Sequence, residues 1–138
     1  TSLDLTKNTK LEQLELNINK LTEIDLSANV LITKLDLSQG GITNLDLTQN
    51  TLLNKVNAWN SKIISLNVTD LTNLVLLSIE NCTELTNLNV STNINLTSLT
   101  VTGNTNLTCI QVNDSQLSSI PSNWTKDNST SYSVDCTQ

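Results

Sequence analysis

Aliphatic and polar residues alternate along this chain in one short phrase, LxxLxLxxN, which recurs through most of the sequence. Residues 35–50, LDLSQGGITNLDLTQN, hold the central part of the phrase twice, as Leu35–Asp36–Leu37 and Leu45–Asp46–Leu47. This period of two is typical of a strand with one buried face. A helix would need apolar residues at a spacing of about 3.6 over roughly ten or more positions, and the units are too short for that. The pattern therefore predicts a series of short strands.

The units recur at regular steps of ten or eleven residues, so that two of them make a turn of 21 or 22 residues. Repetition on this scale is characteristic of a solenoid, in which each turn stacks on the last. The first apolar positions of the units are Leu11, Leu21, Ile32, Ile42, Leu53, Ile63, Leu74, Leu85, Leu96, Leu107 and Leu117.

These units resemble the leucine-rich repeats, in particular a bacterial, internalin-like kind in which ten- and eleven-residue units, LxxLxLxxNx and LxxLDLSxNxx, are nested. The resemblance covers about residues 3 to 120. It implies a mostly β leucine-rich-repeat solenoid of about five to six turns, with parallel strands in both half-units and little or no helix. Residues 1–116 are expected to form the solenoid, with a truncated or uncapped N-terminus, and residues 117–138 a C-terminal capping segment of the same single domain.

The last position of the phrase is usually asparagine. A turn that leaves a strand places backbone N–H and C=O groups inside the solenoid, and an inward amide can bond to both kinds. Cys82 occupies one such position, where leucine-rich repeats often allow cysteine; since the chain has no histidine to act as its base, a buried thiol is expected there. The expected ladder contains Asn8, Asn19, Asn29, Asn50, Cys82, Asn93 and Asn104.

The sequence after Pro121 departs from the repeat and resembles the C-terminal cap of secreted and surface-anchored repeat proteins of the Bacteroidetes. A disulfide between Cys109 and Cys136 would close a loop around Trp124 and Tyr132, over the last open turn. Such a bridge would contribute about 3 to 4 kcal/mol. It also predicts an extracytoplasmic location, either secreted or at the cell surface.

Alternate units should lie on opposite sheets, and one of the two outer faces is nearly uniform. It carries Asp or Asn followed two positions later by Thr or Ser, which indicates small polar residues that stack along a sheet in a structural role. A calcium ion that relieves the repulsion between stacked carboxylates is a weaker alternative, because Thr and Ser on an open face are poor at completing six or more ligands. The residues concerned are Asp4, Asp25 and Asp46, continued by Asn67 and Asn89.

The other face changes from turn to turn and is called the variable sheet below. An exposed tryptophan among mixed charges, Trp59, is typical of a binding hot spot, and an aromatic plane also suits a sugar ring. Alternatively, Trp59 folds over the space left by Ala58, where other units have Leu or Val. The ladder asparagine is also missing in this region, at Gly40, Ser61, Leu71 and Cys82, as happens at functional sites and in decaying repeats. The candidate binding residues are Lys34, Asp36, Lys55, Asn57, Trp59, Leu76, Ser78 and Glu80.

Charge and composition argue against several functions. The chain has 13 acidic residues against 7 basic ones, all lysine, and a net charge of -6, so nucleic acid and anionic membranes would repel it. No apolar run approaches the roughly 20 residues of a membrane span. Glu15 and Asp36 would be neighbours, and carboxylates about 5 Å apart can serve a retaining glycosidase. A flat sheet, however, offers no cleft to exclude water or to separate their pKa values, so no enzyme and no cofactor are expected.

Two functions from different classes remain. The first is a non-enzymatic recognition or adhesion module of a secreted or cell-surface bacterial protein, which binds a protein or polysaccharide through the variable sheet around Trp59. The second is a structural spacer of a larger surface protein with no ligand of its own. In both cases we expect a monomeric module within a longer chain.

Overall fold

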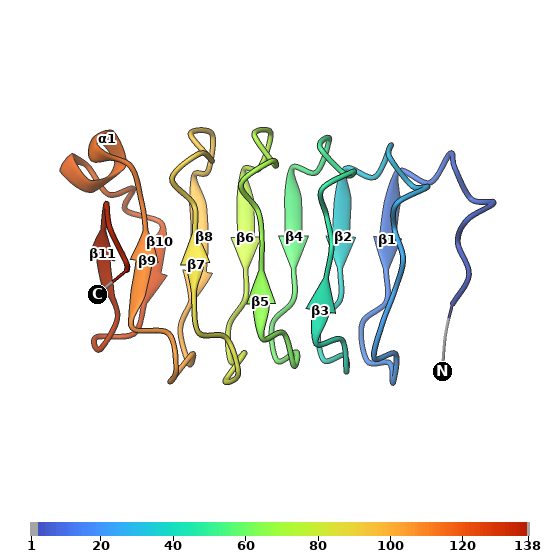
Figure 1. Ribbon diagram of the computed structural model, residues 1–138, viewed down its shortest axis with the longest axis horizontal. Coiled ribbons are helices and arrows are strands. Elements are labelled where there is room, and N and C mark those ends of the chain that lie inside the picture. The colour runs from blue at the N-terminus through green and yellow to red at the C-terminus, as the bar shows by residue number, and fades with distance from the viewer. Residues whose placement is uncertain (1–2, 138) are drawn as a thin grey trace.

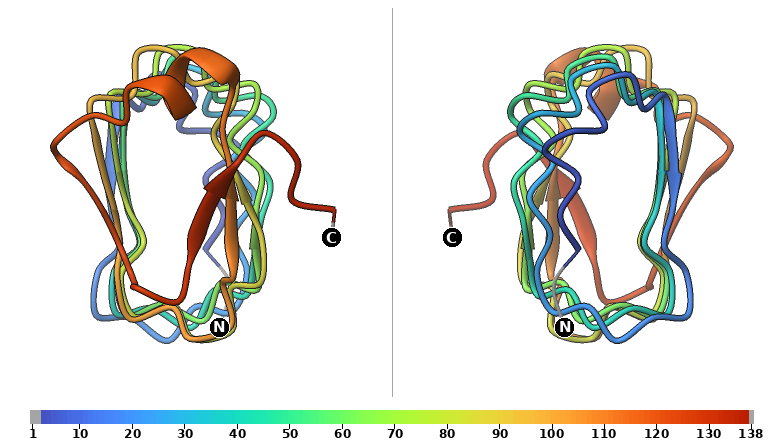
Figure 2. Two further views of the ribbon diagram at one scale, coloured as in Figure 1. Left: turned by 90° about the vertical axis from the view of Figure 1, so that its left-hand side faces the viewer. Right: turned by 90° about the vertical axis from the view of Figure 1, so that its right-hand side faces the viewer.

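The computed structural model describes residues 3–137, whose turns follow one another along a single axis (Figure 1). In each turn the chain runs up one side of the solenoid and down the other, which leaves a narrow space between two walls (Figure 2). The result is a parallel β-solenoid of about six turns, as the sequence predicted.

The first wall is the variable sheet, with six parallel strands that all come from alternate half-units. Neighbouring strands pair in register, because each turn repeats the apolar position that points inward. In spatial order the strands are β1 (Gln13–Glu15), β2 (Lys34–Asp36), β4 (Lys55–Asn57), β6 (Leu76–Ser78), β8 (Ser98–Val101) and β10 (Trp124–Lys126).

The second wall is less continuous and consists of two short sheets with strands of two or three residues. Near the ends of its strands, polar side chains bond within their own turns. Asp46 Oδ1, for example, accepts hydrogen bonds from the backbone N–H and the hydroxyl of Thr48, at 2.9 and 2.7 Å. The strands are β3 (Asn44–Leu45) and β5 (Ser65–Leu66) in one sheet, and β7 (Leu88–Asn89), β9 (Cys109–Gln111) and β11 (Ser131–Ser133) in the other.

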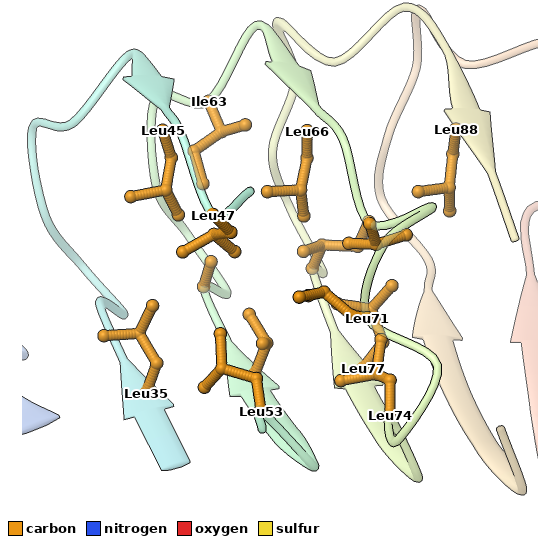
Figure 3. Packing of buried hydrophobic residues seen from close by; sticks show 14 of the residues in the cluster. Leu35, Leu45, Leu47, Leu53, Ile63, Leu66, Leu71, Leu74, Leu77 and Leu88 are labelled. Atoms are coloured by element: carbon orange, nitrogen blue, oxygen red, sulfur yellow. The ribbon is translucent and has the colours of Figure 1, made fainter. Parts of the chain in front are cut away.

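A column of aliphatic side chains fills the space between the walls. Leu45, Leu66 and Leu88 occupy equivalent positions in successive turns, and Leu35 and Leu77 face them from the variable sheet (Figure 3). Full burial of one such side chain stabilises the fold by about 1.5 to 3 kcal/mol. Because every turn contributes the same kinds of side chain, the core has nearly constant thickness along the axis.

The C-terminal segment continues both walls, with β10 beside β8 and β11 beside β9. Between β9 and β10 the chain forms the helix α1 (Asp114–Ser118), which replaces the half-unit expected at Leu117 and leaves that side chain 42% exposed. A helix thus stands where the sequence pattern placed a further repeat unit, at Leu117, while the prediction of little helix is confirmed. As a helix of five residues, α1 is too short to cross a membrane.

The expected disulfide between Cys109 and Cys136 is present. It holds the end of the chain beside a small aromatic group, in which Trp124 and Tyr132 have ring centroids 5.9 Å apart. Trp124 is only 7% exposed and donates its indole N–H to the carbonyl of Leu96 at 3.2 Å. The last leucines of the core are thus covered by packed side chains rather than by solvent.

Candidate functional site

The outward side chains of the variable sheet form three rows that run across the strands. The rows arise from the in-register pairing, which places equivalent residues of neighbouring strands about 4.8 Å apart. The first row is Gln13, Lys34, Lys55, Leu76 and Ser98, and the second is Glu15, Asp36, Asn57, Ser78 and Thr100.

The third row lies just beyond the assigned strands, where backbone hydrogen bonds continue the same pairing. The N–H of Gln39 donates to the carbonyl of Trp59 at 2.9 Å, and the N–H of Asn60 donates to that of Glu80 at 2.6 Å. Trp59 therefore lies between Ser38, which is buried, and Glu80. The structure places all eight candidate binding residues on this one surface, over the neighbouring strands β2, β4 and β6.

Asp36 has hydrogen-bond partners for both of its carboxylate oxygens. Oδ1 accepts from the backbone N–H of Ser38 at 3.0 Å, and Oδ2 accepts from the side-chain amide of Asn57 at 3.4 Å. Partial burial raises the pKa of Asp36, but the bonds from Ser38 and Asn57 and the charge of Lys55 together outweigh it and lower the pKa below its ordinary value. Asp36 is therefore an ionised carboxylate that the sheet itself stabilises.

Glu80 is held in a similar way. Its carboxylate accepts hydrogen bonds from the hydroxyls of Ser78 and Thr102, at 3.3 and 3.4 Å. These two bonds fix the acid beside Trp59 in the third row.

A shallow hollow of about 70 Å³ lies between the first and second rows. The strands lie beneath it at Leu14 and Leu35, whose side chains point into the core, and its rim includes Lys34 and Lys55, which are direct partners on adjacent strands. Within residues 3–137 no carboxylate lies within 4.0 Å of either ammonium group. The two lysines thus place like charges side by side without a compensating ion pair.

Trp59 is 39% exposed, while Ala58 behind it is completely buried. The aromatic pair and the cation–π contact in the described part of the chain are formed at the C-terminal end by Trp124, Tyr132 and Lys126. Neither contact includes Trp59. Part of the Trp59 ring is therefore available to a ligand.

On the uniform face the polar groups bond to each other in the way that Asp36 and Ser38 do on the variable sheet. In each of these repeats the side-chain oxygen of Asp or Asn accepts from the residue two positions later, so these residues form local turns within the stack expected from the sequence. The pairs are Asp4–Thr6, Asp25–Ser27, Asp46–Thr48, Asn67–Thr69 and Asn89–Ser91.

These hydrogen bonds involve the three carboxylates that the calcium alternative would require. Hydrogen bonds from Thr6, Ser27 and Thr48 lower the pKa values of Asp4, Asp25 and Asp46. No group of three His, Cys, Asp or Glu side chains within residues 3–137 is arranged to hold a metal ion.

The ladder residues divide between two columns, because alternate units end at opposite corners of the solenoid. In one column Asn50 Nδ2 donates to two carbonyls of the turn before it, Leu26 O at 3.1 Å and Asn29 O at 3.0 Å, whereas Asn8 in the first described turn is exposed. Asn29 and Asn93 bond in the same manner. Sequence reasoning missed the last member, Gln116 of α1, whose amide reaches Val90 O and Asn93 O at 3.1 and 3.3 Å.

The second column runs behind the end of the variable sheet through Asn19, Gly40, Ser61, Cys82 and Asn104. Cys82 is fully buried, and its thiol donates to the carbonyl of Ala58 at 3.0 Å. The column ends at Asp127, whose carboxylate accepts the backbone N–H groups of Gly103 and Asn104, both at 2.9 Å. Asp127 follows Asn104 by 23 residues, so the repeat spacing was the signal that could have identified it.

Glu15 and Asp36 are direct partners on β1 and β2, as the glycosidase alternative required. They lie beside the hollow of about 70 Å³ on an outward sheet face. Asp36 is also bound by Ser38 and Asn57, which favours its ionised form over that of a proton donor.

No protein-family model and no curated protein sequence matches this chain. Among solved structures, the functional domain of InlJ from Listeria monocytogenes, which includes a cysteine ladder, is similar with a TM-score of 0.71 and 26% identity. That match covers 79% of this chain and 26% of the other. An internalin (inlF) from Listeria monocytogenes has a TM-score of 0.59 and 20% identity, over 90% of this chain and 43% of the other. The chain thus spans less than half of either protein, and it is similar to internalins in forming a leucine-rich-repeat solenoid.

Proposed function

We propose that this chain is a non-enzymatic recognition module that binds a partner protein through the variable sheet, around Trp59, Lys34 and Lys55. The supporting observation is the difference between the two faces. The uniform face uses its Asp and Asn side chains in hydrogen bonds within its own turns. The variable sheet instead presents a half-exposed tryptophan and two lysines without ion-pair partners in the described residues.

The arrangement of these groups suits a protein interface. Tryptophan is among the residues that contribute most to binding energy, especially when near-neutral contacts around it exclude water. Ser78 can supply such a contact, since it lies on the adjacent strand β6 one row from Trp59, and Leu76 lies one row further along the same strand. The similarity to internalins supports a role in protein interaction or adhesion.

We further propose that the module acts outside the cytoplasm, in a secreted or cell-surface bacterial protein of the Bacteroidetes type. Its support is the disulfide between Cys109 and Cys136, since such bonds persist mainly in oxidising compartments.

The test uses the intact chain on arrays of purified extracellular proteins and of polysaccharides. We expect protein ligands, and we expect Trp59→Ala to weaken their binding about tenfold or more because it removes the central aromatic contact. Ile94→Ala is the matched control, because Ile94 is also a large apolar residue, 76% exposed, but lies outside the strands of the variable sheet. Thermal unfolding of both variants checks that the fold is retained.

Three outcomes would contradict the proposal. Binding to polysaccharides alone would identify a different class of ligand. Protein binding that Trp59→Ala leaves intact would place the contact elsewhere on the surface. Absence of any ligand on either array would favour a spacer that separates other domains.

A further inference from the structure

The lysine pair on the variable sheet has an electrostatic arrangement that the fold does not require. Lys34 and Lys55 are register partners on β2 and β4, in the same row and on the same face. Like charges directly opposite each other on a sheet are destabilising. The other members of this row, Gln13, Leu76 and Ser98, carry no charge, so the row has a single positive centre.

The two acids beside the lysine pair are Asp36 and Glu15, and within the described residues neither forms an ion pair with it. Both oxygens of Asp36 already accept hydrogen bonds, from Ser38 and Asn57. Glu15 is exposed on the rim of the same hollow and forms no ion pair with a described lysine. Within residues 3–137 neither ammonium group has a hydrogen-bond or ion-pair acceptor, and a carboxylate from outside would supply one.

The size of the hollow determines what can enter it. Pockets for small-molecule ligands usually have volumes of about 300 to 1,000 Å³. A hollow of about 70 Å³ is well below that range and suits the end of one side chain. Lys34 and Lys55 both line it, so the carboxylate of an aspartate or glutamate can lie between the two ammonium groups.

We propose that Lys34 and Lys55 together bind a carboxylate side chain, Asp or Glu, of the partner protein. The proposal rests on the proposed function and names the chemistry of the partner at that site. Trp59 lies two rows from the lysine pair, just beyond the end of β4, which carries Lys55. The partner therefore places its acidic residue over the hollow and an apolar surface over the tryptophan.

A direct test does not require the natural partner. The lysines of the intact protein are methylated with ¹³C, which preserves their charge, and are followed by NMR during addition of N-acetyl-glutamate methylamide. We expect the signals of Lys34 and Lys55 to shift more than those of the other five lysines. The neutral probe N-acetyl-glutamine methylamide should cause no such shift, and about 0.5 M NaCl should reduce the effect of the acidic one.

Charge variants establish whether the lysines act as a pair. Lys55→Gln should weaken the response of Lys34 to the acidic probe by about fivefold or more, because one of the two ammonium groups is lost. Lys62→Gln is the matched control, since Lys62 is exposed and lies outside the strands. Glu15→Gln should strengthen the response, because it removes a negative charge from the rim. Weaker binding in Glu15→Gln, or equal shifts at all lysines, would overturn the proposal.

The outcome with a full partner separates this inference from the proposed function. Where a protein ligand is found, Lys34→Gln combined with Lys55→Gln should weaken its binding about tenfold. If Trp59→Ala abolishes binding and the double lysine variant does not, the carboxylate site is wrong and the recognition function stands. If no ligand exists, the recognition function is wrong, and the NMR titration still decides whether the lysine pair binds a carboxylate.

Discussion

Replacement of Asn50 by alanine should destabilise the solenoid by an amount that the ladder geometry predicts. The Asn50 amide donates two hydrogen bonds, to Leu26 O and Asn29 O, and the side chain is almost completely buried. Both carbonyls also accept a backbone N–H, from Asn29 at 3.0 Å and from Ile32 at 3.2 Å, so neither is left without any partner. The loss is therefore that of two ordinary bonds, about 1 kcal/mol each, with up to about 1 kcal/mol more for the void.

Urea unfolding followed by circular dichroism measures this loss. A decrease of about 2 to 3 kcal/mol corresponds to a midpoint lower by about 1 to 2 M. The matched control is Asn73→Ala, because Asn73 donates its amide to Thr51 O at a similar distance, 3.0 Å, but is exposed. Water can replace that bond, so the control should cost less than about 0.5 kcal/mol.

The comparison would refute the reasoning in either of two ways. Equal losses in the two variants would mean that burial does not set the strength of the ladder bonds. A loss below about 1 kcal/mol in Asn50→Ala would mean that the stacked leucines alone hold the turns together.

Four further predictions concern stability. Replacement of Cys109 and Cys136 by serine should cost about 3.5 kcal/mol in urea unfolding, from the loop of 27 residues that the bridge closes; an unchanged midpoint would contradict this. Trp124→Ala should cost about 3 to 5 kcal/mol, because it uncovers the end of the core, and a much smaller loss would mean that the cap is dispensable. The lowered pKa of Asp46 contributes stability that is present above the unfolded-state pKa and is lost as the pH falls through the lower folded-state pKa. Asp46→Asn should keep the turn, as Asn67 and Asn89 do, and flatten the melting temperature against pH in that acidic range; an unaltered profile would contradict the assignment. Gly103→Ala should lower the melting temperature, because φ is +78° and an added Cβ would collide with the side chain of Asn81; tolerance would mean that this corner can relax.

The repeat allowed most of the fold to be predicted from the sequence. Leu35, Val56 and Leu77 recur at the same position of successive units, and the structure pairs them in register within the core. The same spacing separated the uniform face from the variable sheet, since a period of two assigns each residue to one side. The disulfide was also predictable, because Cys109 and Cys136 flank the segment that departs from the repeat.

The features that were missed depend on where the chain turns after the repeat ends. Gln116 continues one ladder from within a helix, and Leu117 becomes exposed there, which a ten- or eleven-residue template cannot represent. Asp127 ends the other ladder with two backbone bonds that require the chain to fold back across the last turn. The hollow at Lys34 and Lys55 likewise depends on how the outward side chains pack above the strands, and the spacing alone does not define its volume.

The direction of the ladder bonds gives the solenoid a polarity. Asn50 completes the turn that ends at Asn29, Asn29 completes the turn before it, and Gln116 completes the turn of Asn93. A turn that is followed by an amide at this position thus depends on its successor. Leu71 interrupts the series, and the disulfide-closed C-terminal end depends on no later turn. Loss of order should therefore begin at the N-terminal turns and advance toward the cap, so that amide hydrogen exchange slows progressively along the chain.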